Sequence, residues 1–284
     1  MKKVVVVLAL MLTSSFAFAQ DAPAAAQDAP ESKFTAAVDV VAPYMWRGVK
    51  LYSNNIAFQP YASYAATEKL TVGFWMTTNL SSAADAYNEY DWYVSYQVTP
   101  ILKVMLSDYY APATKKNVET YGFSRANYFD YGFGSAQVMD LSILLDFSDK
   151  GVPIDFQWNT LVNGNDYKDV EYDSNGEVLN KNRAFSSYSE IGYTHSIESI
   201  GVNLRGFVGA AVINNNAYYG LHQDGTAGFA FTNVGLNVAK EIKFSEKFSL
   251  PVFLRYTYNE DGRKSLDGEK QVNIISGGLT LTIK

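Results

Sequence analysis

The residues best suited to chemistry in this chain are charged side chains set at every second position of otherwise apolar stretches. Asp91, Asp140 and Arg205 are examples. Such alternation places the charges on one face of a β-strand and the apolar residues on the other. The candidates for this charged face are Asp39, Arg47, Asp91, Lys103, Asp140, Asp146, Asp155, Glu190, Arg205 and Arg255. Their mixed signs suit either ion selection along an open pore or mutual pairing in a closed interior.

The charged face has more acids than bases, so an open pore lined by it should show a mild preference for cations. Arg47 is of special interest because it is expected near the end of a strand, in the segment Tyr44-Met45-Trp46-Arg47-Gly48. There its guanidinium can pair with a carboxylate such as Asp91 or hold a loop in place. The functional alternative is a constriction or a ligand contact.

Catalytic chemistry has few candidates. A serine nucleophile needs a histidine base within hydrogen-bond reach and a third group that orients the base. The chain has two histidines: His195 is expected at a short turn, and His222 in a long loop beside Gln223 and Asp224. We therefore expect no enzymatic activity, and lipid hydrolysis is the enzymatic alternative.

One acidic stretch resembles a calcium-binding loop. Counted from Glu171, oxygen ligands recur at Asp173 and Asn175, and Gly176 takes the sixth position. The twelfth position is Asn182, which lacks the bidentate carboxylate that such a loop needs. Since Asn-Gly also marks hairpin tips, we predict a turn here and no metal or other cofactor. Weak divalent binding at the surface is the alternative.

Twelve segments can supply the strands that carry the charged face, each near or above the roughly 9–11 residues of a tilted transmembrane strand. They are expected at 34–48, 54–66, 69–79, 88–98, 100–111, 134–147, 153–163, 185–195, 200–212, 227–243, 247–258 and 270–284. An even number of strands suits a bacterial barrel with both termini on one side of the membrane.

The alternation also predicts which face meets lipid. Within 153–163, Ile154, Phe156 and Trp158 alternate with polar residues. Because Arg or Lys at the lipid midplane costs about 2–4 kcal/mol, the charged face must point into the lumen. The predicted fold is therefore all-β, an antiparallel up-and-down transmembrane β-barrel. The soluble alternative, a sandwich or ligand-binding barrel, would turn its apolar face inward.

The connections between these segments switch between short and long. The short ones lie at 67–69, 99–100, 148–151, 196–199 and 245–247, and the long ones near 81–87, 112–133, 163–184, 213–225 and 258–270. Outer-membrane barrels keep tight turns on the periplasmic rim and long loops outside. We therefore expect the protein to lie in the bacterial outer membrane, with both termini on the periplasmic side. The aromatic-rich segment 112–133 is expected either to fold back over the mouth or to cap its hairpin from outside.

The N-terminal residues have the features of a secretory signal. Lys2 and Lys3 precede an apolar run, and Ala17-Phe18-Ala19 forms a small-residue cleavage site. We predict a signal peptide at 1–19, a disordered periplasmic lead-in at 20–32 and the barrel at 33–284. The absence of cysteine rules out disulfides and thiolate metal sites. The formal net charge of −6 argues against nucleic acid as a partner.

Several motifs taken together resemble one family over nearly the whole mature chain. The most specific are Tyr44-Met45-Trp46-Arg47-Gly48 and the downstream Asn88-Glu89-Tyr90-Asp91-Trp92. With them the chain resembles the Gcw_chp or TorF-type porin family of bacterial outer-membrane proteins. The resemblance implies an outer-membrane barrel that acts as a porin, with no enzymatic site to carry over. One departure from common barrel practice is the final residue, Lys284, where an aromatic residue is usual.

The expected function is therefore passive diffusion of small hydrophilic solutes through the lumen. The expected partners are outer-membrane lipid, the barrel assembly machinery and the solutes themselves. The alternative is a barrel with a closed lumen that serves a structural or surface-recognition role.

Overall fold

The structure is a computed structural model. It describes residues 33–51, 56–80, 87–112, 127–213, 218–219, 228–245, 248–259 and 272–283. The predicted signal peptide, the predicted lead-in, His222 and Lys284 lie outside these residues. In the described part of the chain, no helix is both long and apolar enough to cross a membrane.

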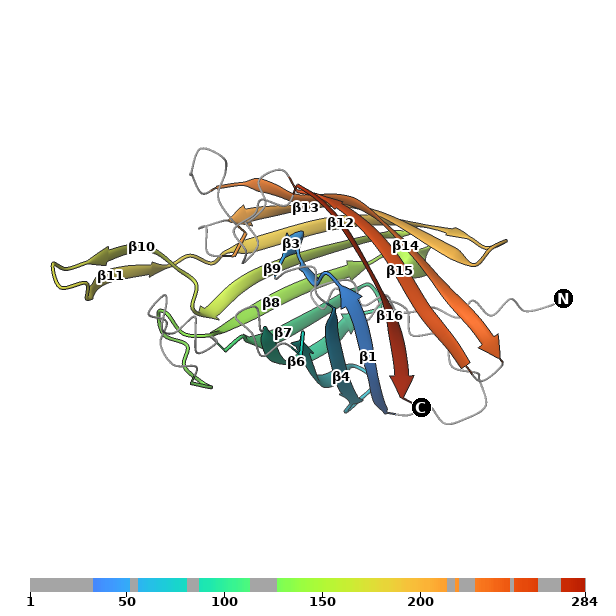
Figure 1. Cartoon of the computed structure of the whole chain (residues 1–284), viewed down its shortest axis with the longest axis horizontal. Helices are drawn as coiled ribbons and strands as arrows, with labels where there is room; N and C mark the ends of the chain where they lie inside the picture. Colours follow the sequence, from blue (N-terminus) through green and yellow to red (C-terminus); the bar gives the residue numbers. More distant parts are fainter. Residues whose placement is uncertain are drawn as a thin grey trace.

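Twelve antiparallel strands form one closed barrel, which confirms the predicted fold class (Figure 1). The barrel closes where the first strand pairs with the last, for example Asp39 with Thr280. In chain order the strands are β1 (Phe34–Ala42), β4 (Ala57–Ala65), β5 (Leu70–Thr78), β6 (Asn88–Thr99), β7 (Leu102–Tyr110), β8 (Gln137–Asp146), β9 (Ile154–Gly164), β12 (Ser187–Ile197), β13 (Val202–Ile213), β14 (Ala230–Ser245), β15 (Phe248–Tyr258) and β16 (Asn273–Ile283).

Short and long connections lie at opposite ends of the barrel, as the sequence predicts. Strands β6 and β7 are joined by residues 100–101, and β8 and β9 by a short segment that contains the 3-10 turn η1 (Ser148–Lys150). At the other end, β9 and β12 are joined by residues 165–186. The start of β1 and the end of β16 share the short-turn end, away from β10 (Tyr167–Tyr172) and β11 (Val178–Arg183) (Figure 1).

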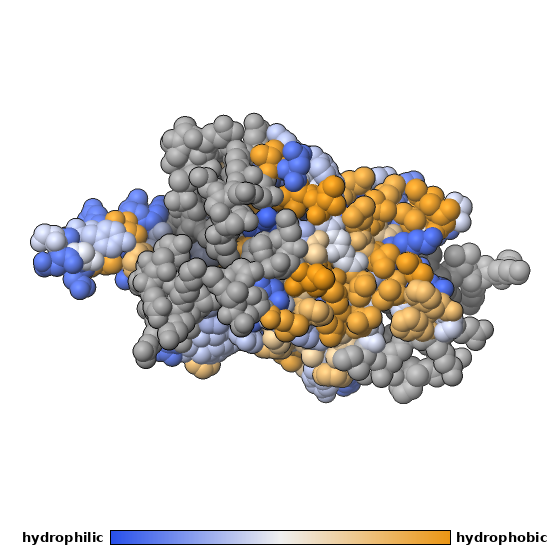
Figure 2. Space-filling model, viewed as in Figure 1, coloured by the Kyte–Doolittle hydropathy of each residue, from blue (hydrophilic) through white to orange (hydrophobic). Residues whose placement is uncertain are grey.

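Apolar side chains cover the outer wall of the barrel. Leu141, Ile143, Ile191 and Leu254 are exposed, whereas the residues that alternate with them on β8, such as Ser142, are buried. Figure 2 shows the resulting hydrophobic zone over the barrel strands. A barrel that is apolar outside and polar inside is suited to lipid and not to water.

Placing a charge on this wall should destabilise the barrel in its membrane. We expect Ile143→Lys to lower the free energy of unfolding by about 2–4 kcal/mol, because an ammonium at the lipid midplane loses its hydration. The measurement is urea unfolding in lipid vesicles. The matched control is Leu179→Lys on β11, in the hairpin that projects from the long-loop end. There the side chain is 67% exposed, and the free energy of unfolding should change by less than about 0.5 kcal/mol. Equal effects at the two positions would contradict the assignment of the lipid face.

The predicted loop 163–184 contains a regular hairpin, formed by β10 (Tyr167–Tyr172) and β11 (Val178–Arg183). It projects from the long-loop end, at the left of Figure 1. Asp173 begins its turn and accepts the backbone N–H groups of Glu177 and Asn175 at 2.8 Å each. These bonds, with that from Glu177 the largest cause, hold the pKa of the Asp173 carboxyl below its ordinary value. The turn predicted for this acidic stretch is confirmed.

The first predicted strand, 34–48, is wrong at its end. β1 stops at Ala42, and the chain then forms a second small hairpin, β2 (Met45–Trp46) with β3 (Val49–Lys50). Pro43 has no N–H to continue the ladder with a neighbouring strand. Arg47 and Gly48 both have positive φ, +46° and +80°, which is typical of the tight turn that reverses a two-residue hairpin. The next strand accordingly begins at Ala57.

Candidate functional site

The hairpin between β1 and β4, residues 43–50, folds into the barrel and not outward. Tyr44, Met45, Trp46, Val49 and Lys50 are all at most 7% exposed. The hydrogen bond from Leu51 N to Tyr44 O, 3.2 Å, closes its base. We call residues 43–50 the inward hairpin.

The tip of the inward hairpin is anchored to the opposite wall by an ion pair. Arg47 Nη2 lies 2.9 Å from Asp140 Oδ2 on β8, and Arg47 Nη1 donates to the Tyr219 hydroxyl at 2.8 Å. Asp140 Oδ2 also accepts from Ser142, at 2.8 Å, and from Tyr109. Arg47 and Asp140 are almost wholly buried, so the pair lies in a region of low dielectric where losing one partner is costly.

The same tip packs closely against β14. A Cβ atom added at Gly48 would lie 2.4 Å from the carbonyl oxygen of Thr232. Asn259, which follows β15, donates its amide to the Gly48 carbonyl at 2.8 Å. Positive φ and the close approach to Thr232 together explain why glycine stands at this position. The inward hairpin therefore spans the lumen from β1 to β8 on one side and to β14 on the other.

Apolar side chains from strands all around the barrel pack on the inward hairpin. Trp46 stacks on Tyr219 with ring centroids 5.4 Å apart and contacts Tyr109 edge-on. Tyr44 packs against Trp75. The buried cluster comprises Val41, Tyr44, Met45, Trp46, Ala57, Trp75, Tyr109, Val138, Leu161, Tyr188, Ala211, Tyr219 and Ile274. At this level the lumen holds a hydrophobic core centred on the hairpin.

The sequence suggested Asp91 as the partner of Arg47, and this prediction is wrong. Arg47 pairs with Asp140 and not with Asp91, because the chain leaves the wall after Ala42 and carries Arg47 across the lumen. Asp91 lies on β6 and accepts the backbone N–H of Tyr110 at 3.3 Å. Of the two earlier interpretations, the contacts of Arg47 fit a residue that holds a loop in place.

A second charged cluster lies on the wall formed by β9, β12 and β13. Arg205 donates from Nε to Asp155 Oδ2 at 2.9 Å, and its Nη2 lies 2.8 Å from Glu190 Oε1. Glu190 also accepts from Tyr188 at 2.6 Å and from Asn233 at 2.7 Å. One guanidinium thus neutralises two buried carboxylates, which is the mutual pairing that the sequence left as an alternative.

Gly192 makes this second cluster possible. Gly192 pairs with Asp155 across β9 and β12, and a Cβ atom added to it would lie 2.3 Å from Arg205 Nη2. The side chain of Arg205 must therefore cross the strand directly over Gly192 to reach Asp155.

We expect Gly192→Ala to lower the free energy of unfolding by about 1–3 kcal/mol, because the added methyl displaces a guanidinium held by two carboxylates. The control is Gly206→Ala on the neighbouring strand, where an added Cβ meets nothing within 4 Å. Both can be measured by denaturant unfolding of the refolded barrel. A larger loss for Gly206→Ala than for Gly192→Ala would contradict this packing.

The other predicted lumen residues are spread along the wall. Asp39 on β1 is 1% exposed and accepts from Thr280 at 2.7 Å. Asp146 and Lys103 lie toward the short-turn end, where Asp146 accepts from Ser148. Arg255 on β15 lies over the ring of Phe207, 5.4 Å from its centroid. The structure thus gathers Arg47 with Asp140, and Arg205 with Asp155 and Glu190. Arg255 lies beside the second cluster, since it also interacts electrostatically with Glu190.

Two acids that sequence reasoning did not select are also buried. Glu89 points inward two residues before Asp91, and its alternation with Tyr90 was a usable signal. Asp108 is fully buried and in register with Trp92 and Met139 of the outer face. Asp108 lies on the side of its strand where the period-two rule expects apolar residues. The alternation of the sequence therefore could not identify Asp108 as a buried acid.

Part of the aromatic segment 112–133 covers Asp108. Tyr131 donates its hydroxyl to Asp108 at 3.2 Å, and Gln137 donates its amide to the same carboxylate. Tyr128 packs edge-on against Tyr110 at 4.7 Å. The described part, 127–133, thus contacts the barrel from outside; Tyr121 and Phe123 lie outside the described residues. Burial is the largest cause raising the pKa of the Tyr131 phenol to about 12.

His195 lies within β12, opposite Leu204 of β13, and is exposed. The position predicted for it, at a turn, is wrong by a short distance, since the strand continues to Ile197. Within the described residues, no group of three or more metal-binding side chains gathers in one place.

No known family model matches the sequence, and no curated protein matches it either. Among solved structures, a Pseudomonas aeruginosa FadL homologue is 9% identical and matches with a TM-score of 0.37 over 88% of this chain and 74% of its own. LpxR from Salmonella typhimurium is 10% identical, with a TM-score of 0.36 over 87% and 99%. OmpF from Salmonella typhi, in complex with daunomycin, is 9% identical, with a TM-score of 0.36 over 88% and 96%. The closed sheet and its apolar outer wall define this protein as a β-barrel of the outer-membrane type.

Proposed function

We propose that the protein is an outer-membrane channel for small hydrophilic solutes whose lumen is narrowed by the inward hairpin. The observation that carries the proposal is the charged interior wall of the barrel, with Asp39, Asp155, Glu190 and Arg205, which are at most 7% exposed while the inward hairpin is in place. Buried ion pairs add little stability over apolar residues of similar size. A barrel that served only as a scaffold would therefore gain little from this charged wall, whereas the same wall would line a water-filled passage when the inward hairpin moves aside.

The orientation and surroundings follow from the same proposal. Both termini face the periplasm, because they share the end with the short turns, and the long connections face outward. The outer wall contacts lipid, and assembly machinery inserts the barrel. The resemblance of the Tyr44 to Gly48 motif to TorF-type porins supports this assignment, and catalysis has no part in it.

The second candidate is a barrel with a closed lumen in a structural or recognition role. The hydrophobic core on the inward hairpin favours it, because a plug so tightly packed suits a permanent fixture. The two candidates differ in whether solutes pass through the barrel when the inward hairpin is absent.

The deciding experiment is solute flux into liposomes that contain the refolded barrel. The wild type is compared with a variant in which residues 44–50 are replaced by a short glycine linker. A channel should admit small neutral sugars slowly in the wild type and rapidly in the variant. Flux at the lipid background in both proteins, with the barrel shown to be folded by its resistance to detergent, would exclude the channel.

A further inference from the structure

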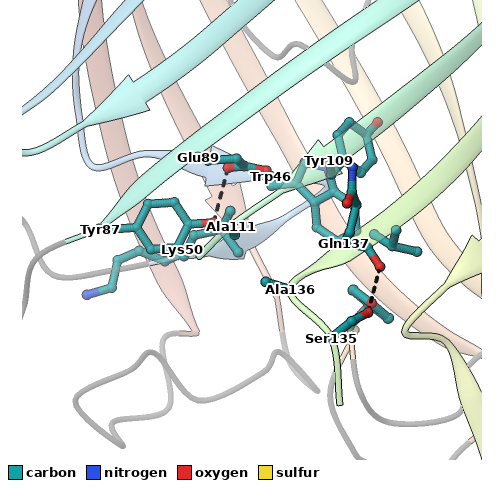
Figure 3. A pocket seen from close by; sticks show the side chains of 12 residues that line it. Trp46, Lys50, Tyr87, Glu89, Tyr109, Ala111, Ser135, Ala136 and Gln137 are labelled. Atoms are coloured by element: carbon teal, nitrogen blue, oxygen red, sulfur yellow. Dashed lines mark hydrogen bonds between the residues drawn. The ribbon is translucent and has the colours of Figure 1, made fainter. Parts of the chain in front are cut away.

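A cavity of about 250 Å³ lies at the long-loop mouth, between the inward hairpin and strands β6 to β8 (Figure 3). Its walls include the aromatic side chains Trp46, Tyr87 and Tyr109 and the small side chain of Ala111. The volume is below the about 300–1,000 Å³ typical of sites for drug-sized ligands. It therefore suits a solute smaller than a drug-sized ligand.

One carboxylate faces this cavity. Glu89 accepts the hydroxyls of Tyr44 and Tyr87, at 3.3 and 3.1 Å, and both bonds end on Oε2. Figure 3 shows the bond from Tyr87. Among the described residues none donates to Oε1, and Oε1 is not among the enclosed atoms that lack a partner. Oε1 therefore keeps surface on the cavity and has acceptor capacity for a donor that enters it.

The nearby cations leave this charge available. The amino end of Lys50 points away from Glu89 in Figure 3. Arg47 is paired with Asp140 at 2.9 Å and is not part of the cavity wall. The Glu89 carboxylate thus lies beside phenol rings in the cavity wall, and the other polar side chains of the wall are Lys50, Ser135 and Gln137.

We propose that this cavity binds a small primary alkylammonium ion. Its N–H groups donate to Glu89 Oε1, and its carbon chain lies against the rings of Tyr87 and Tyr109, whose π faces attract cations. This names a solute class for the proposed channel, and passage of that solute rests on the proposed function. Binding of the ion at the mouth does not depend on the proposed function, because it needs only the folded barrel.

The test is titration of the detergent-solubilised, refolded full barrel with n-propylammonium chloride, followed by tryptophan fluorescence and by calorimetry. We expect saturable binding of one ion per barrel and roughly tenfold or greater loss of affinity in Glu89→Gln, because a charge-assisted hydrogen bond is lost. Glu177→Gln on the projecting hairpin removes the same charge elsewhere and should leave the affinity unchanged. n-Propanol, a neutral analogue, should bind at least as weakly as the ion binds to Glu89→Gln.

A second variant covers the case in which Glu89→Gln does not fold. Ala111→Leu fills part of the cavity, keeps the Glu89 side chain unchanged in the sequence and should abolish binding. The proposal is overturned if the wild type shows no saturable binding, if both variants keep wild-type affinity, or if n-propanol binds as tightly as the ion. Binding without solute flux would contradict the channel but not the alkylammonium site. Solute flux without binding would contradict the alkylammonium site but not the channel.

Discussion

Replacing Arg47 by alanine should turn a barrel of low conductance into one that conducts several times more current. The Arg47 guanidinium is the polar anchor of the inward hairpin on β8, through Asp140 and Tyr219. Without it, the contacts of the tip with the described residues are the Asn259 bond and apolar packing. The hairpin should then leave the lumen for part of the time, and conductance follows the effective radius of the pore.

The same substitution leaves the Asp140 carboxylate buried without its cation. Removing one partner of a buried ion pair typically costs about 3–5 kcal/mol, and part of this cost is relieved if water enters as the hairpin moves. Asp140→Asn should also release the hairpin. The double variant Arg47→Ala with Asp140→Asn should be less destabilised than the sum of the single changes, since both remove one interaction.

The measurement is single-channel recording in planar bilayers. Lys150→Ala, which removes an exposed cation at the short-turn end, is the control and should conduct as the wild type does. Unchanged conductance in Arg47→Ala, with the barrel folded, would show that the ion pair does not hold the obstruction in place.

Replacing Arg205 by methionine should have the largest effect on stability. Arg205 neutralises both Asp155 and Glu190, so its removal takes the shared cation from two carboxylates on neighbouring strands, and Arg255 remains near Glu190 alone. We expect a loss of about 3–5 kcal/mol in the free energy of unfolding, measured by urea denaturation in lipid vesicles.

A matched rescue separates the charge effect from packing. Adding Asp155→Asn and Glu190→Gln to Arg205→Met removes the unpaired charges and should restore most of the lost stability, as apolar and neutral replacements of buried ion networks often do. If Arg205→Met alone costs less than about 1 kcal/mol, the carboxylates must be hydrated, and this cluster is not the buried network described above.

The barrel itself was predictable because two independent signals agree along the chain. Alternation with period two, as in Ile154 to Asn159, gives both strand and face. The positions of Gly, Pro, Asn and Asp give the turns. Strand ends moved by a few residues where these signals were weak, as at the start of β14.

The inward hairpin could not be predicted, since Tyr44, Met45 and Trp46 continue the apolar character of β1. Pro43 marks the end of β1, but only Arg47-Gly48 marks the turn beyond it, and arginine is an uncommon residue at positive φ. The partner of Arg47 was equally hidden, because Asp140 lies far along the chain and on the other side of the lumen. Alternation with period two predicts which residues of a strand face the lumen, but it cannot predict the path of a segment that leaves the barrel wall.

The most direct test of the central claim compares the single-channel conductance of the wild type with that of the variant lacking residues 44–50. The inward hairpin occupies the lumen and the charged wall lines a passage, so we predict small, infrequent currents in the wild type and large, stable steps in the variant. Equal conductance in the two proteins, or silence in both, would contradict the account.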